Sequence, residues 1–467
     1  MSGTSALWVS LALCTCLVWA ATGMDPVDVP DQETGEEDLF HAVFPVECKL
    51  NSLLWQTVGL WYSFRKSKMP GSFTRLLACK EEKRQEFQDA GAMDICPTHV
   101  TPSYTEYKTR DSYGPYNMAG TILHWVTHVT PKEKYVLILD SDMVILRPLL
   151  PGDLGVLPGR AVAAQYGYLK GVSNDLALRH IPEITPRNDS LGGPRGRRSD
   201  QAGGVQAMAF TDLQRVAPLW LEYTKRVRED PKAWEDTGDV YVRPGGKPWI
   251  SEMYGYSFGC AKADVWHVTN QTMMLYPEYH PTGFPSVMHY GIEFHIGDGY
   301  NFHKHWFPYL DALKCPPWQT TAAAERSGLE GLLPAPPHPR ELADEGSIMD
   351  KLQHLYAAAT VATLNEALCE LHLKRCELSQ FLLDTCLEAM KLSDDIYQEI
   401  REQERIASGE TCYDRRSWCH TWMESGECER NPDFMLPSCP KSCGVCREIS
   451  HPEACSAAGT CSAETVD

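Results

Sequence analysis

Residues 135–139, Tyr-Val-Leu-Ile-Leu, form an unbroken apolar run that ends at two carboxylates, Asp140 and Asp142. Such a run is typical of a parallel strand covered on both faces. If the backbone stays extended, both carboxylates project to the same side of the strand. Paired carboxylates repel unless a cation lies between them, and hard oxygen ligands suit Mg²⁺ or Mn²⁺. The pattern therefore predicts a divalent-metal site at a strand end, with an ordinary Asp turn as the alternative.

Strands and helices alternate around this run. We expect further strands at residues 39–44, 73–79, 160–168 and 205–210, and helices at 56–64, 81–89 and 118–128. Another helix should follow Thr211 as its cap, and residues between the helices at 81–89 and 118–128 read as a loop rich in Pro, Thr and Tyr. This order predicts an α/β fold with a mostly parallel sheet. Cys48 and Cys79 end consecutive strands, so we expect them to be bonded.

The start of the chain predicts the compartment. Residues 6–21 are mostly apolar and uncharged and end in small residues, which fits a signal peptide over 1–23, with an uncleaved membrane anchor as the alternative. Of the 18 cysteines only Cys14 and Cys16 precede residue 24, and the sequons at Asn188 and Asn270 agree with a secretory route. We expect the lumen of the endoplasmic reticulum or Golgi, or secretion. The net charge of −19 argues against a nucleic-acid partner.

A lone acid, Glu252, lies among apolar and aromatic residues in the block 249–256. Desolvation there would raise its pKa and make it a candidate for the reaction centre. An acid at the start of an ordinary helix is the alternative.

Four histidines gather in residues 289–305. His289, beside an aromatic residue and Gly291, is the best candidate for a third ligand of the Asp-x-Asp metal, and Lys304 is placed to meet a diphosphate. His303 and His305 have weak zinc-like spacing and are better explained as surface residues.

Residues 188–204 form a Gly-rich insertion that carries Arg195, Arg197 and Arg198. A mobile surface loop explains this composition better than a phosphate site does. Gly203 and Gly204, at its end, are nevertheless candidate cofactor-binding residues.

The last third of the chain differs in composition. A Pro-rich break at 334–339 precedes a helical stretch at 342–406. On one continuous helix Cys369 and Cys376 would lie about 10.5 Å apart, so each must bond elsewhere or the helix must break between them. Six cysteines then fall within residues 412–446, a density that indicates a disulfide-stapled module. A metal-binding module would need Cys-x-x-Cys pairs, and Cys443 and Cys446 supply one.

Several blocks together resemble the peptidyl serine α-galactosyltransferase family of plants and green algae. They are residues 46–48, 55–60, 139–143, 165–169, 250–258, 288–291 and 363–368. The resemblance implies a GT-A fold, UDP-galactose as donor, a divalent metal and transfer to serine of hydroxyproline-rich proteins with Ser-Hyp repeats. It implies that Asp140, Asp142 and His289 bind the metal, that Gly291 and Lys304 contact the donor, and that Glu252 serves the reaction centre or acceptor. The Arg-rich insertion departs from the family pattern.

The six-cysteine segment resembles a ShK toxin-like domain, which implies the pairs Cys412–Cys446, Cys419–Cys439 and Cys428–Cys443. We therefore divide the chain into a leader at 1–23, an acidic linker at 24–37, a GT-A-like domain at 38–330, a Pro-rich and helical extension at 331–409, a ShK-like module at 410–447 and a tail at 448–467. Two other functions stay open. One is hydroxyproline O-arabinosylation, and the other is a secreted binding protein with a degenerate transferase fold.

Overall fold

The structure, a computed structural model, describes residues 35–107, 111–189, 196–318, 330–342, 346–409, 414 and 419–445. Residues 34–404 form one compact unit, and the residues after it belong to a second unit that is treated by itself. The predicted leader, the tail and most of the acidic linker lie outside the described residues. Among the described residues, no helix has the length and apolar character needed to cross a bilayer.

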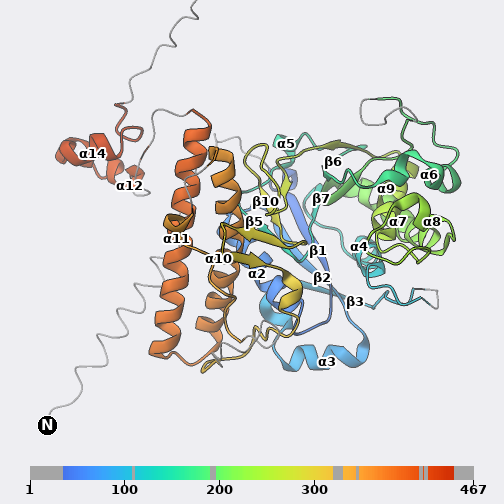
Figure 1. Cartoon of the computed structure of the whole chain (residues 1–467), viewed down its shortest axis with the longest axis horizontal. Coiled ribbons are helices and arrows are strands. Elements are labelled where there is room, and N and C mark those ends of the chain that lie inside the picture. Colours follow the sequence, from blue (N-terminus) through green and yellow to red (C-terminus); the bar gives the residue numbers. More distant parts are fainter. Residues whose placement is uncertain are drawn as a thin grey trace, which may run out of the picture. The chain divides into compact units, whose positions relative to one another are not determined.

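The core of the first unit is a seven-stranded sheet in the order β3-β2-β1-β4-β7-β6-β8 (Figure 1). Its strands are β1 (Phe40–Glu47), β2 (Ser72–Ala78), β3 (Thr98–Thr101), β4 (Tyr135–Ile138), β6 (Arg160–Gln165), β7 (Ala202–Ala209) and β8 (Trp266–Thr269). All neighbours pair in parallel except β7, which is antiparallel to both β4 and β6. The predicted class, α/β with a mostly parallel sheet, is confirmed.

Strand β4 is covered on both faces, as its apolar run predicts. Val136 and Ile138 pack into the cluster formed with helices α4 (Tyr116–His128) and α7 (Phe210–Glu229). Leu137 and Leu139 belong to the opposite cluster, which includes helix α2 (Leu54–Lys66). This two-sided burial ends where the polar residues begin, so the Asp pair follows the carboxyl end of this central strand.

Three local predictions need correction. Strand β3 lies inside the segment predicted as a loop, because a short edge strand of Thr, His and Val has no apolar run to mark it. Strand β6 ends at Gln165, since the chain turns at Tyr166. Helix α7 starts at Phe210 after an extended Ala209, so Thr211 lies inside the helix and is not its cap. The apolar face predicted for this helix is buried as expected, through Leu213, Val216, Ala217 and Trp220.

A second, small sheet carries residues of the site. It contains β5 (Met143–Ile145), β10 (Val287–His289) and β9 (Met274–Leu275) in the order β5-β10-β9, and a hairpin of β11 (Phe294–Ile296) and β12 (Tyr300–Phe302) follows. The chain turns between β4 and β5, so Asp140 and Asp142 lie in a turn. The expected extended backbone at the Asp pair is therefore wrong, although both carboxylates still reach one place.

Helix α9 (Ser251–Lys262) packs closely on α7 because it carries glycines at the contact. A Cβ on Gly255 would lie 2.1 Å from the Thr224 hydroxyl, and one on Gly259 would lie 2.9 Å from the Trp220 amide nitrogen. This packing fixes the first turn of α9, where Glu252 stands. The other helices of this part are α3 (Glu81–Asp89), α5 (Pro151–Leu154), α6 (Asp175–His180) and α8 (Ala233–Thr237), with short 3-10 turns at Glu36–Asp38, Met93–Ile95, Lys170–Ser173, Lys304–Trp306 and Pro339–Glu341.

Two long helices, α10 (Ile348–Arg375) and α11 (Gln380–Ala407), complete the first unit, and α10 packs on α2 (Figure 1). The missing Cβ of Gly59 admits the Leu364 side chain, since a Cβ there would lie 2.3 Å from it. Lys66 on α2 pairs with Glu366 on α10. Disulfides Cys315–Cys376 and Cys369–Cys386 confirm that each helix cysteine bonds elsewhere, and the predicted Cys48–Cys79 bond is also present.

The described part of the Arg-rich insertion is tied to the fold, which corrects the expected surface loop. Arg197 is 4% exposed and pairs with Asp189 and Asp200. Arg198 donates to the carbonyl oxygens of Pro182 and Ile184. Arg195 lies outside the described residues.

The second unit contains helices α12 (Cys419–Glu424), α13 (Glu427–Arg430) and α14 (Pro432–Ser438). Two of the implied disulfides, Cys419–Cys439 and Cys428–Cys443, are present. The third, Cys412–Cys446, lies outside the described residues.

Candidate functional site

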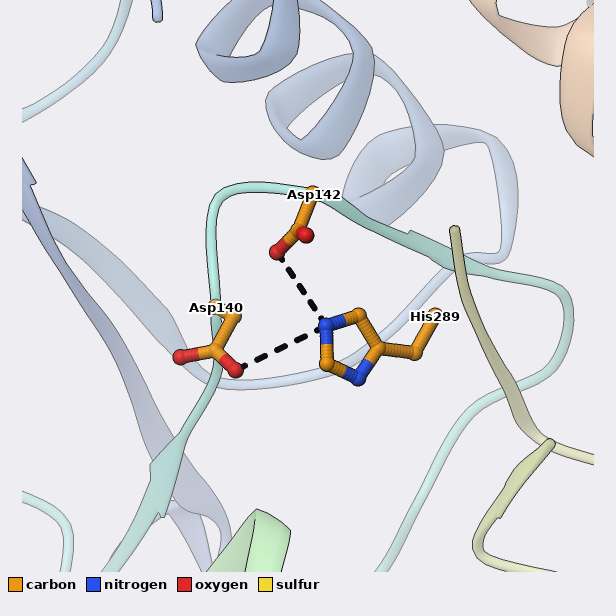
Figure 2. Close-up of side chains that lie close together, drawn as sticks. All are labelled: Asp140, Asp142 and His289. Carbon is orange, nitrogen blue, oxygen red and sulfur yellow. Dashed lines mark ion pairs between the residues drawn. The ribbon is translucent and has the colours of Figure 1, made fainter. Parts of the chain in front are cut away.

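The turn that carries the two Asp residues is held by a hydrogen bond to helix α2. The Ser141 hydroxyl donates a hydrogen bond to Gln56 Oε1 at 2.9 Å. The backbone nitrogen of Asp140 lies 3.4 Å from the Met143 sulfur. These contacts fix the turn, so both carboxylates point to the same side (Figure 2).

Strand pairing brings His289 to this turn from far along the chain. In the antiparallel pair of β10 and β5, His289 stands opposite Met143, and the next amide, of Tyr290, donates to the Asp142 carbonyl at 3.1 Å. His289 Nε2 lies 3.7 Å from Asp140 Oδ2 and 3.3 Å from Asp142 Oδ1 (Figure 2). The structure thus brings together the three residues that the sequence and the resemblance single out.

The chemistry of the cluster fits a divalent cation. Two carboxylate oxygens and one imidazole nitrogen lie within 4.8 Å of one another, and no other group of three such residues was found in the described part of the chain. Gly291 keeps the space open, because a Cβ there would lie 2.9 Å from His289 Nε2 and 3.4 Å from Asp142 Oδ2. His303 and His305 are not members of this cluster.

The pKa values of the two Asp carboxyl groups are shifted in opposite directions. Burial would raise the pKa of Asp142, but Lys304, and then His289, lower it well below the usual range. Lys304 Nζ contacts Asp142 Oδ2 directly, and this carboxylate raises the lysine pKa against the effect of burial. Burial raises the pKa of Asp140 to about 6. Asp142 is therefore the firmly ionised member of the pair, and Lys304 is its partner in the metal-free protein.

The sequence did not single out the tyrosines that support His289. The Tyr166 hydroxyl lies 3.4 Å from His289 Nδ1, and Tyr276 donates to Tyr166 at 3.0 Å and stacks on the imidazole at 4.8 Å. A hydroxyl that accepts the Nδ1 proton leaves the Nε2 lone pair facing the carboxylates. The Tyr-x-Tyr pattern directly after a strand was the available signal.

Gly203 and Gly204, predicted as donor-binding residues, lie inside β7 against Tyr166. A Cβ on Gly203 would lie 2.0 Å from the Tyr166 ring, and Gly204 adopts a positive φ of 69° with its missing Cβ 3.0 Å from the Tyr166 hydroxyl. Their contact is thus with the tyrosine that supports His289. A donor contact for them stays a prediction.

We expect Tyr166→Phe to weaken Mn²⁺ binding about 10-fold, because it removes the hydroxyl beside His289 while leaving the ring in place. Gly203→Ala should weaken it at least as much, since the new Cβ displaces the whole ring. Isothermal titration with Mn²⁺ measures both, and thermal unfolding checks that each variant is folded. Wild-type affinity in a folded Tyr166→Phe protein would contradict this support role.

Glu252 stands at the start of α9 and faces the same region. Its Oε1 accepts from the Trp220 indole at 2.9 Å, and its backbone nitrogen donates to the Tyr113 hydroxyl at 3.1 Å. Burial raises its pKa to about 8, the Asp140 charge adds to the rise, and the Trp220 hydrogen bond opposes it. A carboxyl that titrates near neutral pH beside a carboxylate cluster is a candidate for chemistry.

The sheet-containing part of the chain is similar to a domain of a known glycosyltransferase family. Residues 40–269 match the model described as Hydroxyproline O-arabinosyltransferase family N-terminal domain. Residues 411–446 match the ShK domain-like family. The resemblance seen in the sequence blocks is confirmed.

The chain has relatives named peptidyl serine alpha-galactosyltransferase. It is 42% identical to one of Chlamydomonas reinhardtii over 88% of this chain and 56% of that protein. It is 40% identical to one of Arabidopsis thaliana over 60% of this chain and 34% of that protein. The chain therefore spans about half or less of these relatives. A hydroxyproline O-arabinosyltransferase of Medicago truncatula is 26% identical over 57% of this chain and 67% of that protein.

Proposed function

We propose that this protein transfers galactose from UDP-galactose to serine side chains of hydroxyproline-rich proteins and retains the α configuration. The Asp140, Asp142 and His289 cluster carries the proposal, because it stands in a domain that is similar to peptidyl serine galactosyltransferases. A binding protein with a degenerate fold would have no use for an intact cluster of this kind.

Asp140, Asp142 and His289 would hold a divalent cation, Mn²⁺ or Mg²⁺. When bound, such a cation supplies positive charge that stabilises a departing diphosphate. Lys304 adds a second positive charge at the same side of the site, and its pairing with Asp142 keeps it directed there. Tyr166 and Tyr276 keep the imidazole oriented.

Glu252 is our candidate for the sugar side of the reaction. Positive character develops on the sugar carbon as the diphosphate leaves, and an ionised carboxylate can attack that carbon or stabilise its charge. In its neutral form Glu252 can instead donate a hydrogen bond and orient the sugar. Its raised pKa makes both forms accessible near neutral pH.

The deciding experiment is incubation of the protein with a Ser-Hyp repeat peptide and either UDP-galactose or UDP-arabinofuranose, with Mn²⁺ or with a chelator. We expect galactose on serine, and only with metal. Arabinose on hydroxyproline would support the second candidate, hydroxyproline O-arabinosylation, which the name of the matching family model favours.

The ShK-like module should be separable from catalysis. Its own disulfides and a small cluster around Cys419, Met435 and Cys439 hold the described part together. Deletion of residues 410–467 should therefore leave transfer to a short peptide within about two-fold of wild type. Transfer to a long repeat substrate can fall, because a second attachment point is lost. Loss of turnover on the short peptide would place the module in the active site.

We also propose that the protein works in the lumen of the endoplasmic reticulum or Golgi. Support comes from its disulfides, such as Cys48–Cys79 and Cys315–Cys376, since such bonds persist in oxidising compartments.

A further inference from the structure

Exposed aromatic side chains surround Glu252, and the proposed reaction assigns them no role. The first is Tyr168, which is 39% exposed. Its ring stacks on Tyr166 at 5.1 Å, and its hydroxyl lies 3.3 Å from the sulfur of Met253, the residue after Glu252. Tyr168 therefore stands between the tyrosine beside His289 and the start of α9.

Trp249 lies three residues before Glu252 in the chain and is 49% exposed. Its ring meets Tyr113 edge-on at 5.6 Å, and the Tyr113 hydroxyl donates to the Trp249 carbonyl. The same hydroxyl accepts the Glu252 amide proton at 3.1 Å. The indole is thus fixed to the residue that positions Glu252, yet half of its surface faces solvent.

Tyr241, 64% exposed, lies on the segment between α8 and α9. Both ends of that segment are fixed by Asp239, which accepts from the amides of Tyr241 at 2.7 Å and Ile250 at 3.0 Å. Tyr241 also lies close enough to Tyr168 and Lys304 to act electrostatically on both, and it contributes to the raised pKa of each. Exposed aromatic residues that gather at one place on a protein surface mark a candidate binding site.

We propose that Tyr168, Tyr241 and Trp249 form an acceptor platform that binds a proline- or hydroxyproline-rich peptide in the polyproline II conformation beside Glu252. The inference rests on the proposed function and names how its acceptor is held. Polyproline II segments dock on exposed aromatic faces, because the preformed helix loses little entropy and the C–H groups of its pyrrolidine rings pack against aromatic rings. Tyrosine and tryptophan supply such faces with only two side-chain torsions to fix.

An acceptor fits this place better than the donor does. The groups that would meet a diphosphate, Lys304 and the Asp pair, are largely buried, whereas the platform is open to solvent. An extended peptide that crosses the platform passes Glu252, where its serine hydroxyl must arrive for transfer. Prolines on both sides of the serine would hold that hydroxyl in place.

The test compares Tyr241→Ala/Trp249→Ala with wild type, and Tyr309→Ala, equally exposed at 64%, serves as the matched control. Binding of a Ser-Hyp repeat peptide is measured by titration calorimetry without donor, so this arm does not depend on turnover. We expect the double variant to bind at least about 10-fold more weakly and the control to bind like wild type. Replacing the flanking Hyp residues of the peptide by Ala should weaken wild-type binding and add little loss in the double variant.

Kinetics separate the platform from the chemistry. The double variant should raise the acceptor KM, whereas its Mn²⁺ affinity and its thermal unfolding should match those of wild type. Unchanged peptide affinity in the double variant would overturn the platform, as would an equal loss for the Tyr309→Ala protein. If wild type binds the peptide through these residues but does not use UDP-galactose, the proposed donor is wrong and the platform stands.

Discussion

Replacing Asp142 by Ala should abolish galactosyl transfer and should also destabilise the metal-free protein by about 3 kcal/mol. Transfer is lost because a ligand of the cation is removed. Stability falls because Lys304, whose side chain is 20% exposed, loses the carboxylate that it contacts. Urea unfolding in the presence of a chelator gives the free energy, and titration with Mn²⁺ gives the loss of metal binding.

Asp140→Ala is the matched control for this experiment. It removes the same chemical group two residues away, and metal binding and transfer should be lost as well. Stability without metal should stay equal or rise, because burial already disfavours the ionised form of Asp140 and raises its pKa to about 6. Equal destabilisation of both variants would contradict the unequal charges described for the pair, and full metal-dependent turnover by Asp142→Ala would contradict the site itself.

Glu252→Gln should lower kcat/KM for transfer by 100-fold or more while leaving Mn²⁺ binding unchanged. The wild-type pH profile then tells how Glu252 acts. Burial, the main cause of its pKa of about 8, does not depend on the cation. If the ionised carboxylate attacks or stabilises the sugar, kcat/KM rises with pH through about 8, because the deprotonated fraction rises there. If the neutral acid orients the sugar, kcat/KM falls over the same range.

Measurements of kcat/KM from pH 6 to 9.5 distinguish these two roles, and the Gln variant should lose the transition in either case. A profile that keeps its transition near pH 8 in the Gln variant would assign that transition to another group.

Most helices and strands of the main sheet could be predicted from the sequence, because the patterns that indicate them are local. The apolar run before Asp140 predicts a strand buried on both faces, and Val136 and Leu137 indeed pack into opposite clusters. The Asp pair was found for the same reason. What local patterns missed was the turn at the pair, since the change of direction depends on Gln56 holding Ser141.

The rest of the site depends on contacts between distant segments. His289 meets the Asp pair through strands of three residues, which are too short for any periodic pattern. The sequence predicted that Lys304 contacts a diphosphate. The ion pair between Lys304 and buried Asp142 appears only in three dimensions. Gly203 and Gly204 were predicted to bind the donor, and their contact with the Tyr166 ring appears only in three dimensions.

The packing of α10 on α2 limits where the chain can be truncated without loss of the site. Similarity to the family model stops at residue 269, but His289, Gly291 and Lys304 come later in the chain. Later still, Leu364 fills the space left by Gly59, on the helix whose Gln56 holds the Asp turn. A fragment that ends at residue 269 would therefore lack His289, Gly291 and Lys304. It would also expose the face of α2 that packs on α10. The compact unit that contains this site extends to residue 404, well beyond residue 269, where the match to the family model ends.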